Sequence, residues 1–235
     1  MCGRYATTRS TAELSVIFEA ADETDDLLAP DYNVAPTDPA PIVRITPEPR
    51  AGATAGRVLS VARWGLTPHW ADDARSAARM INARAETVAE APAFRASFAA
   101  RRCLVPADGW YEWPAPGRPV FLTPTTDEPL VFAGLWAANA AVPGRLSCAV
   151  VTIGAVGALA RVHDRMPLLL PRQRWADWLT AEDASGLLTP PTAEWLSTVE
   201  IRPVGRAVGD VRNDGPGLVE RLAAPPPEAE QIGLF

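Results

Sequence analysis

The chain has 235 residues, 48% of them hydrophobic, and this length and composition fit one globular domain with a short tail. Its formal net charge of −6 argues against wrapping of long duplex DNA, because that affinity comes mainly from neutralising phosphates, but it allows a local basic site. The sequence has no apolar run of about 18 residues and no signal-peptide core, so we expect a cytoplasmic protein without a membrane span.

Cys2 stands directly after the initiator methionine, and its small side chain favours removal of Met1. The mature terminus would then carry a thiol and a primary amine on adjacent carbons. The α-amino group has a reference pKa of about 7.7–8.0, against about 10.4 for lysine, so an appreciable fraction is neutral at pH 7. Such an amine attacks an aldehyde, and the thiol can then close a durable five-membered thiazolidine. All 22 basic residues are arginine, so no lysine can replace the terminal amine.

A helix is predicted next, because Ser10 and Glu13 form a capping box ahead of apolar residues at helical spacing. We place it at 11–20 and assign it a structural role. An acidic loop follows, and then come three extended segments bounded by proline and glycine: 32–37, 42–45 and 57–64. A turn at 64–70 that carries two tryptophans and a compact polar stretch at 81–87 complete this half.

The second half opens with a short helix predicted at 92–100. Two strand pieces within 103–113 then meet at Asp108-Gly109. In a strand, Trp110 and Glu112 share one face, so Glu112 is a carboxylate flanked by aromatic residues. The remaining predicted elements are strands at 120–122, 130–136 and 147–153, short helices at 154–162 and 172–179, and a last structured stretch from 201 to about 222. Short strands dominate without βαβ alternation, which predicts a single α+β domain with a curved or barrel-like mixed sheet and flanking short helices.

Cys103 and Cys148 lie in apolar, strand-like runs and are expected to be buried small hydrophobes. With Cys2 they make 3 cysteines, an odd number without C-x-x-C spacing, so neither a disulfide framework nor a zinc site is predicted. Glycine-rich phosphate loops, H-E-x-x-H and G-x-S-x-G are also absent, which removes support for the common nucleotide-binding, zinc-protease and serine-hydrolase activities. We therefore expect no metal and no cofactor.

A few polar residues remain as candidates for chemistry. Taken singly, Asn82 and Arg84 are typical of solvated turns. Glu112 alone is typical of a solvent-facing strand position, and His163 of a structural histidine. Together with a terminal nucleophile, however, they supply an amide for orientation, an acid, and a base that titrates near neutrality.

Several blocks of the chain resemble, in the same order, those of the SRAP (SOS-response-associated peptidase) family. The blocks are 1–4, 32–36, 64–65, 81–87, 108–113, 163–167 and 206–209. Their order makes the resemblance more specific than any one block, and it covers residues 2 to about 222. It implies a monomeric protein with a pseudo-barrel α+β domain over 1–222. This domain would sense abasic sites in single-stranded DNA. It also implies a covalent crosslink to the ring-opened sugar, which shields replication forks near the nucleoid, and peptidase-type and lyase-type activities.

The same resemblance implies roles for individual residues. Cys2 would be the nucleophile and attachment point, Asn82 would help sense the abasic sugar, and Glu112 and His163 would stabilise and process it. Proton shuttling by a His and a Glu agrees with these roles. Residues implied at the DNA are Arg4, Asn33, Pro36, Trp70, Arg84 and Arg165. Arginine forks suit phosphate oxygens, and stacking on an aromatic ring needs no particular base sequence. Ordinary core packing remains the alternative for Trp70 and Pro36.

Two other functions compete with this interpretation. One class of glutamine amidotransferases also begins Met-Cys-Gly and uses the terminal cysteine as the nucleophile of an amidohydrolase. That similarity fits only the first three residues and leaves 108–113 and 163–167 unexplained. A non-catalytic module that binds single-stranded DNA is the third possibility, and it needs no mature Cys2 terminus.

The tail at 223–235 has its own pattern. Three consecutive prolines prevent a helix, so a flexible, extended spacer is predicted ahead of the apolar terminal cluster. Its last residues resemble the short peptide with which bacterial polymerases and repair proteins bind the DNA sliding clamp. In that binding mode Gln231 donates a hydrogen bond in one pocket, while Leu234 and Phe235 fill an apolar one. The alternative is a frayed end or a strip that docks on its own domain.

Overall fold

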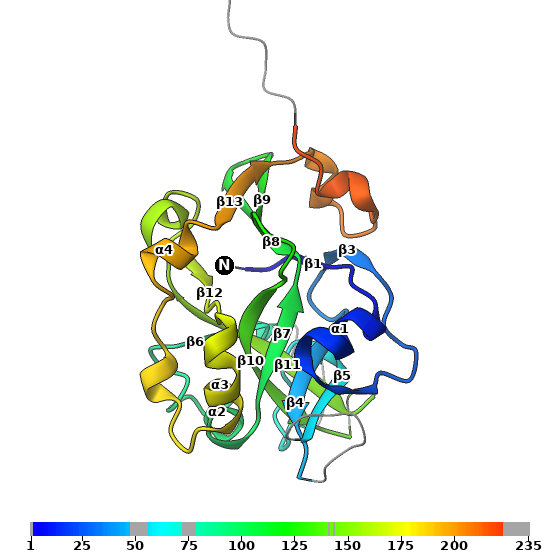
Figure 1. Ribbon diagram of the computed structural model, residues 1–235, viewed down its shortest axis with the longest axis vertical. Coiled ribbons are helices and arrows are strands. Elements are labelled where there is room, and N and C mark those ends of the chain that lie inside the picture. The colour runs from blue at the N-terminus through cyan, green and yellow to red at the C-terminus, as the bar shows by residue number, and fades with distance from the viewer. Residues whose placement is uncertain (1, 48–55, 72–78, 141, 143, 223–235) are drawn as a thin grey trace, which may run out of the picture.

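Two β-sheets form most of the computed structural model, which describes residues 2–47, 56–71, 79–140, 142 and 144–222. The smaller sheet, toward the top of Figure 1, has the strand order β13-β9-β8-β1-β3. Its strands are β1 (Tyr5–Thr7), β3 (Asp31–Val34), β8 (Gly109–Ala115), β9 (Arg118–Pro124) and β13 (Val199–Pro203). The tail at 223–235, with the predicted clamp peptide, lies outside the described residues.

The larger sheet has the order β12-β11-β10-β7-β4-β5-β2, and one further strand, β6, pairs with β11. Its strands are β2 (Ala21–Glu23), β4 (Pro39–Ile45), β5 (Arg57–Trp64), β6 (Asn82–Arg84), β7 (Arg102–Ala107), β10 (Leu130–Ala138), β11 (Leu146–Gly154) and β12 (Arg165–Pro167). β11 pairs with β10 on one side and, in parallel, with β5 on the other. The strands β11, β10, β7, β4 and β5 therefore close into a ring, which confirms the predicted pseudo-barrel and the α+β class.

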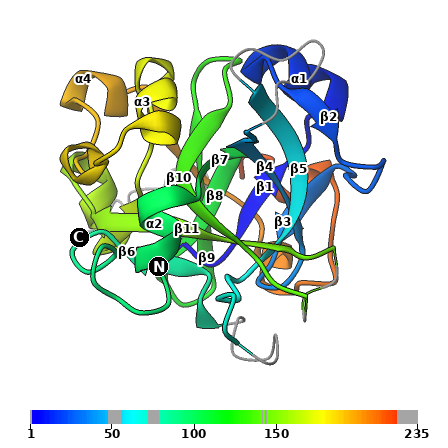
Figure 2. The same ribbon diagram turned by 90° about the horizontal axis from the view of Figure 1, so that it is seen from below.

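Short helices cover the outside of this ring. The α-helices are α1 (Thr11–Phe18), α2 (Arg95–Ala100), α3 (Trp175–Thr180) and α4 (Ala193–Leu196). The 3-10 helices are η3 (Gly157–Arg161), η4 (Arg172–Arg174), η5 (Ser185–Leu187), η6 (Arg206–Gly209) and η7 (Pro216–Leu218). Figures 1 and 2 both show α1 on one side of the molecule and α3 and α4 on the other. No helix of the described residues is long and apolar enough to cross a bilayer.

The core combines aliphatic strand residues with a group of aromatic rings. Tyr5 meets Trp64 edge-on with ring centroids 5.0 Å apart, and Phe132 at 5.9 Å. Trp110 also packs edge-on against Phe132, at 6.1 Å. Burying such a side chain stabilises a fold by about 1.5–3 kcal/mol, and edge-to-face pairs add about 0.5–1.5 kcal/mol each. This packing fixes the start of the chain, through Tyr5, to the interior of the ring.

The chain passes from β7 of the larger sheet to β8 of the smaller sheet through a single residue, Asp108. Its carboxylate accepts hydrogen bonds of 2.7 Å from the amide and from the hydroxyl of Thr8. The next residue must be glycine, since a Cβ on Gly109 would lie 2.5 Å from both the Leu122 carbonyl oxygen and the Phe121 ring. The joint directs β8 out of the ring, and with it the segment that carries Glu112.

Most predicted elements are present, with different ends. The capping box at Ser10 and Glu13 is formed, but α1 stops at Phe18 because Glu19 adopts a left-handed conformation with φ 51°. The helix predicted at 154–162 is the 3-10 helix η3, which begins at Gly157 with φ 58°. The three-residue strands β1 and β6 were not predicted, since neither has enough residues to show a periodic pattern.

Candidate active site

The first residues of the chain lie against β8. Tyr5 is paired with Trp110 in the β1–β8 register, and the Tyr111 amide donates a 2.9 Å hydrogen bond to the Arg4 carbonyl oxygen. Because the two segments run antiparallel, residues preceding Arg4 continue along β8 toward Glu112. Cys2 is fully buried there. The terminal segment is therefore a fixed part of the fold rather than a loose end.

Asn82 holds this segment from the opposite side. It belongs to β6, where it pairs with Val150 of β11, and its Nδ2 donates a 2.7 Å hydrogen bond to the Cys2 carbonyl oxygen. Its other amide atom, Oδ1, is buried and accepts no hydrogen bond within the described part of the chain. A buried acceptor of this kind is costly unless a donor arrives, so Oδ1 is suited to receive a hydroxyl or an amine from a ligand.

Glu112 is the carboxylate of the cluster, and its residue is only 4% exposed. Burial raises the pKa of its carboxyl, and the nearby imidazole of His163 partly offsets this by favouring the charged form. A carboxyl with a raised pKa keeps its proton to higher pH than an exposed one. Glu112 is thus suited to act as an acid in one step and as a base in the next.

His163 follows η3 and precedes β12. Its Nδ1 lies 2.9 Å from the Arg165 amide nitrogen and 2.7 Å from Oδ1 of Asp164. Nδ1 can accept from the amide only when it carries no proton, and it can donate to Asp164 only when it does. The two contacts therefore hold the ring with Nδ1 as the acceptor in one tautomer and as the donor in the other.

The environment of the Cys2 thiol disfavours its ionisation. Burial raises its pKa, the negative charge of Glu112 adds to the effect, and a hydrogen bond from the Arg4 amide opposes it. Reactive cysteines usually have lowered pKa values. A neutral thiol at this position favours a reaction in which another group, such as an amine, attacks first.

The arrangement depends on β11, the strand between the two halves of the site. Thr152 lies opposite Arg84 of β6 on one side and opposite Pro167 of β12 on the other. Arg165 of β12 donates to both carboxylate oxygens of Glu86, at 2.8 and 2.9 Å, and to the Thr152 carbonyl oxygen at 2.6 Å. Glu86 and Asp164 were not predicted as site residues, although both lie inside the blocks 81–87 and 163–167.

Like Arg165, two more of the residues predicted at the DNA, Arg4 and Asn33, make hydrogen bonds inside the protein. Arg4 Nη1 donates to Asn33 Oδ1 at 2.7 Å and to the Val208 carbonyl oxygen at 2.9 Å. Asn33 Nδ2 donates to the carbonyl oxygens of Asp210 and Asn213, at 3.0 and 2.8 Å. These bonds fasten the segment after β13 to β1 and β3.

The other predicted DNA contacts lie nearer the surface. Trp70 is 57% exposed, Arg84 is exposed and Pro36 is partly buried. None of the hydrogen bonds of the described residues joins Trp70 to the catalytic candidates. The structure thus brings Cys2, Asn82, Glu112 and His163 together, with Arg84 on the same short strand as Asn82.

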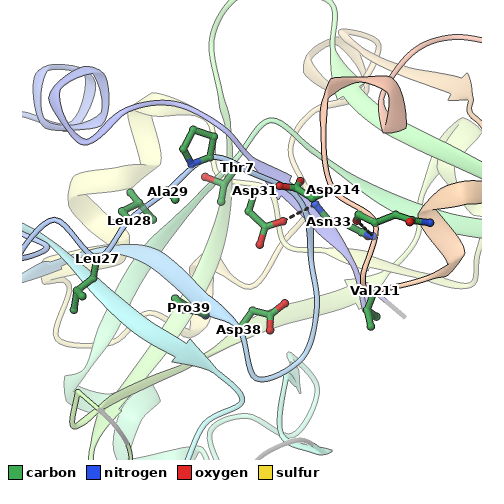
Figure 3. A pocket seen from close by; sticks show the side chains of 12 residues that line it. Thr7, Leu27, Leu28, Ala29, Asp31, Asn33, Asp38, Pro39, Val211 and Asp214 are labelled. Carbon is green, nitrogen blue, oxygen red and sulfur yellow. Dashed lines mark hydrogen bonds between the residues drawn. The ribbon is translucent and has the colours of Figure 1, made fainter.

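A separate hollow of about 230 Å³ is lined in part by Asn33, as Figure 3 shows. Its lining includes three carboxylates, those of Asp31, Asp38 and Asp214. Burial raises the pKa of Asp31, and the charges of Asp214 and Asp38 add to this. The negative charge makes this hollow unsuitable for a phosphate. Among the described residues, no group of three or more His, Cys, Asp or Glu side chains could hold a metal ion.

Residues 1–211 match the family model described as SOS response associated peptidase (SRAP). The chain belongs to the SRAP family. The match covers most of the chain and contains every catalytic candidate, so the resemblance predicted from the motif blocks is confirmed.

Named relatives agree with this assignment, and a solved structure has the same fold. The chain is 31% identical to the Bacillus subtilis "Abasic site processing protein YoqW", over 94% of this chain and 99% of that protein. It is 28% identical to the Escherichia coli "Abasic site processing protein YedK", with the same coverage of 94% and 99%. A crystal structure of a Bacteroides thetaiotaomicron protein has the same fold, with a TM-score of 0.78 at 20% identity, covering 94% of this chain and 100% of that chain.

Proposed function

We propose that this protein captures abasic sites in single-stranded DNA by forming a thiazolidine through Cys2 after removal of Met1. The observation that carries the proposal is the fixed terminal segment: Asn82 holds the Cys2 carbonyl at 2.7 Å, beside the raised-pKa carboxyl of Glu112. The relatives named above as abasic site processing proteins match nearly the whole chain. Their names and the chemistry of this site point to the same substrate.

The first step would be imine formation at the Cys2 amine. The ring-opened abasic sugar presents an aldehyde at C1′, and attack by the neutral amine gives a carbinolamine. This intermediate must lose its hydroxyl as water, and a protonated Glu112 can supply the proton for that loss. His163 can take the proton released from nitrogen, since imidazole is a common general base and this ring is held by the Arg165 amide and Asp164. One C–N bond forms, one water leaves, and no oxidant is needed.

The second step would be closure by the thiol. The S–H adds across the C=N bond, with sulfur bonding to C1′ and the proton moving to nitrogen. A neutral thiol is sufficient here because the addition is intramolecular and uses its own proton. The raised pKa of Cys2 thus fits an order of events in which the amine reacts first. The resulting ring resists hydrolysis better than an open imine, and this would protect the strand during replication.

Positioning of the strand would fall to arginines at the edge of the site. Arg84 is exposed two residues after Asn82, where its guanidinium can contact a phosphate near the captured sugar. Arg165 is paired with the Glu86 carboxylate and would hold β12 against β6 and β11. It would contact DNA only where a phosphate displaces that carboxylate. Peptidase activity would be limited to release of Met1, and lyase activity to strand cleavage through the imine before the ring closes.

The test is incubation of purified protein with an oligonucleotide that contains one abasic site. We expect a heat-stable, gel-shifted adduct attached at residue 2. A glutamine-analogue electrophile, applied in parallel, distinguishes the competing amidohydrolase. Labelling of Cys2 by that electrophile, without any DNA adduct, would replace the present proposal with the amidohydrolase.

The tail carries a separate proposal that rests on sequence alone. We infer that Gln231, Leu234 and Phe235 bind the cognate sliding clamp, which would raise the local concentration of the protein at replication forks. A peptide of residues 223–235 should bind the clamp with micromolar affinity, as a short anchored peptide does. The peptide with Leu234→Ala and Phe235→Ala is the control, and equal binding of both peptides would remove the proposal.

A further inference from the structure

A groove beside the active site has no role in the chemistry described so far. It consists of two adjoining hollows, of about 400 Å³ and about 300 Å³, which share Val156 and Pro190 in their linings. Apart from Glu86 and Ser197, its side chains are apolar. The larger hollow is bordered by the start of η3, by Pro191, by Leu196 of α4 and by Val199 of β13.

The smaller hollow of this groove borders two strands that form the active site, β6 and β11. The smaller hollow is lined by Ala85 and Glu86, which directly follow Arg84 of β6, and by Ile153 of β11. At the other end η3 leads directly to His163, whose amide donates to the Leu159 carbonyl oxygen at 3.3 Å. Figure 1 shows β6, β12 and α4 on the same side of the molecule. A strand held at Cys2 could therefore place its next nucleotide in the groove.

We propose that this groove binds the nucleobase adjacent to the abasic site. The proposal rests on the proposed function, because it assumes that the abasic sugar is held at Cys2. A base next to an abasic sugar has lost its stacking partner on that side, so an apolar face that would otherwise be covered is open to water. Transfer of that face into an apolar groove is favourable without any specific hydrogen bond.

The charges around the groove fit a base better than a phosphate. Glu86 lies in the lining with its carboxylate paired to Arg165, and no arginine stands among the described lining residues. Arg84 and Arg161 are instead exposed on the segments that border the groove. The backbone of the strand would follow these arginines at the rim while the base points inward. Binding of this kind accepts every base, which suits a protein that must recognise a missing base in any sequence.

Two alanines on η3 make a matched pair of test positions. Ala158 and Ala160 are both exposed, but only Ala158 lines the groove. Ala158→Glu places a carboxylate in the groove, and Ala160→Glu adds the same charge two residues away. Affinity is measured for DNA with a central tetrahydrofuran, a non-reactive abasic analogue. Three DNAs are compared: one with both flanking bases, one in which the 5′ flanking nucleoside is also replaced by tetrahydrofuran, and one in which the 3′ flanking nucleoside is replaced.

Removal of the flanking base on one side should weaken binding by wild type and by Ala160→Glu about fivefold to tenfold, the lower part of the range for one stacked base. Ala158→Glu should be equally weak on both DNAs, because its groove is already blocked. The groove proposal would be overturned if removal of the flanking base, on either the 5′ or the 3′ side, weakened binding equally in Ala158→Glu and Ala160→Glu. It would also be overturned if removal of the base on neither side weakened binding by wild type. Adduct formation by wild type is scored separately, and its absence would reject the Cys2 chemistry instead.

Discussion

Buried Asn33 and half-buried Asn82 both contact the first residues of the chain, and they use their hydrogen-bonding groups differently. In Asn33, Oδ1 accepts from Arg4 and Nδ2 donates to two carbonyl oxygens of the segment after β13. In Asn82, Nδ2 donates to the Cys2 carbonyl while Oδ1 remains open. The first arrangement is complete within the protein, whereas in the second Oδ1 has no partner among the described residues.

This difference separates a structural region from a reactive one. Around Asn33 the polar groups connect distant segments and stabilise the fold. Around Asn82 the protein keeps an open acceptor, a carboxyl with a raised pKa and a fully buried thiol in one place. Such groups cost stability and persist where function needs them. The hollow that Asn33 lines carries three carboxylates, so its charge does not suit a phosphate.

The largest effect is expected at Cys2. Cys2→Ala keeps the terminal amine but cannot close the thiazolidine, so it should form at most an imine, with strand cleavage as a side reaction. Cys148→Ala is the control, because burial raises the pKa of that thiol to about 12 and it lies outside the site. Denaturing gels should show a durable adduct for Cys148→Ala and none for Cys2→Ala. A durable adduct of Cys2→Ala without borohydride would reject the thiazolidine.

The proton-transfer residues come next. Removing a general acid or base usually costs about 10²- to 10⁴-fold in rate, so Glu112→Gln and His163→Ala should slow adduct formation by that range. Their affinity for DNA should stay close to that of wild type, since neither is expected to hold a phosphate. Single-turnover kinetics and binding to the tetrahydrofuran analogue separate the two quantities. Losses of affinity as large as the losses of rate would show that these roles are misassigned.

The asparagines themselves give opposite expected outcomes. Asn33→Ala leaves buried partners unsatisfied and should lower the free energy of unfolding by about 1–3 kcal/mol. Asn82→Ala removes one hydrogen bond and a buried acceptor that has no partner among the described residues, so its loss of stability should be smaller than that of Asn33→Ala. Its loss of adduct formation should be larger. Urea unfolding and capture kinetics on both variants test the comparison directly. Equal stability losses would mean that Asn82 is as structural as Asn33.

The raised pKa of Glu112 also predicts a dependence of stability on pH. A carboxyl that binds its proton more tightly in the folded state favours folding below the unfolded pKa of about 4.3, and this contribution is lost as the pH rises through the folded pKa. Glutamine does not ionise. The free energy of unfolding of Glu112→Gln, relative to wild type, should therefore increase with pH above about 4.3. Unfolding curves at several pH values would contradict this if the difference stayed constant.

The smallest effect concerns Arg84. If it contacts one phosphate, Arg84→Ala should weaken binding of single-stranded DNA and reduce the salt dependence of log K by about 0.7, the value for one phosphate on a single strand. Arg118→Ala is a suitable control, because Arg118 is exposed and lies in β9 of the other sheet. Identical salt slopes for the two variants would remove Arg84 from the DNA interface.

Much of the fold was predictable where a pattern is local. The capping box at Ser10 and the strand Arg57–Trp64 follow from residues within a few positions of one another. The four catalytic candidates lie inside short motif blocks, so they too were found without the structure. Three-residue strands such as β6 escaped prediction because their stability comes from pairing with β11 rather than from their own sequence.

The roles of the arginines could not be read in the same way. Arg4 donates to Val208, 204 positions away, and no local pattern encodes that partner. The same holds for Arg165, whose fork is held by Glu86 79 positions earlier. A guanidinium serves a phosphate or an internal carbonyl equally well, so the choice is made by the tertiary structure. The motif blocks located these residues but did not reveal which groups they contact.

The central claim is best tested by the intact mass of the adduct, before and after borohydride. Thiazolidine formation predicts the mass of the protein without Met1 plus that of the oligonucleotide minus one water. Borohydride should leave this mass unchanged, because the closed ring contains no C=N bond, and peptide mapping should place the modification on Cys2. A gain of two hydrogens would reveal an open imine, and a protein that retains Met1 in the adduct would contradict the mechanism.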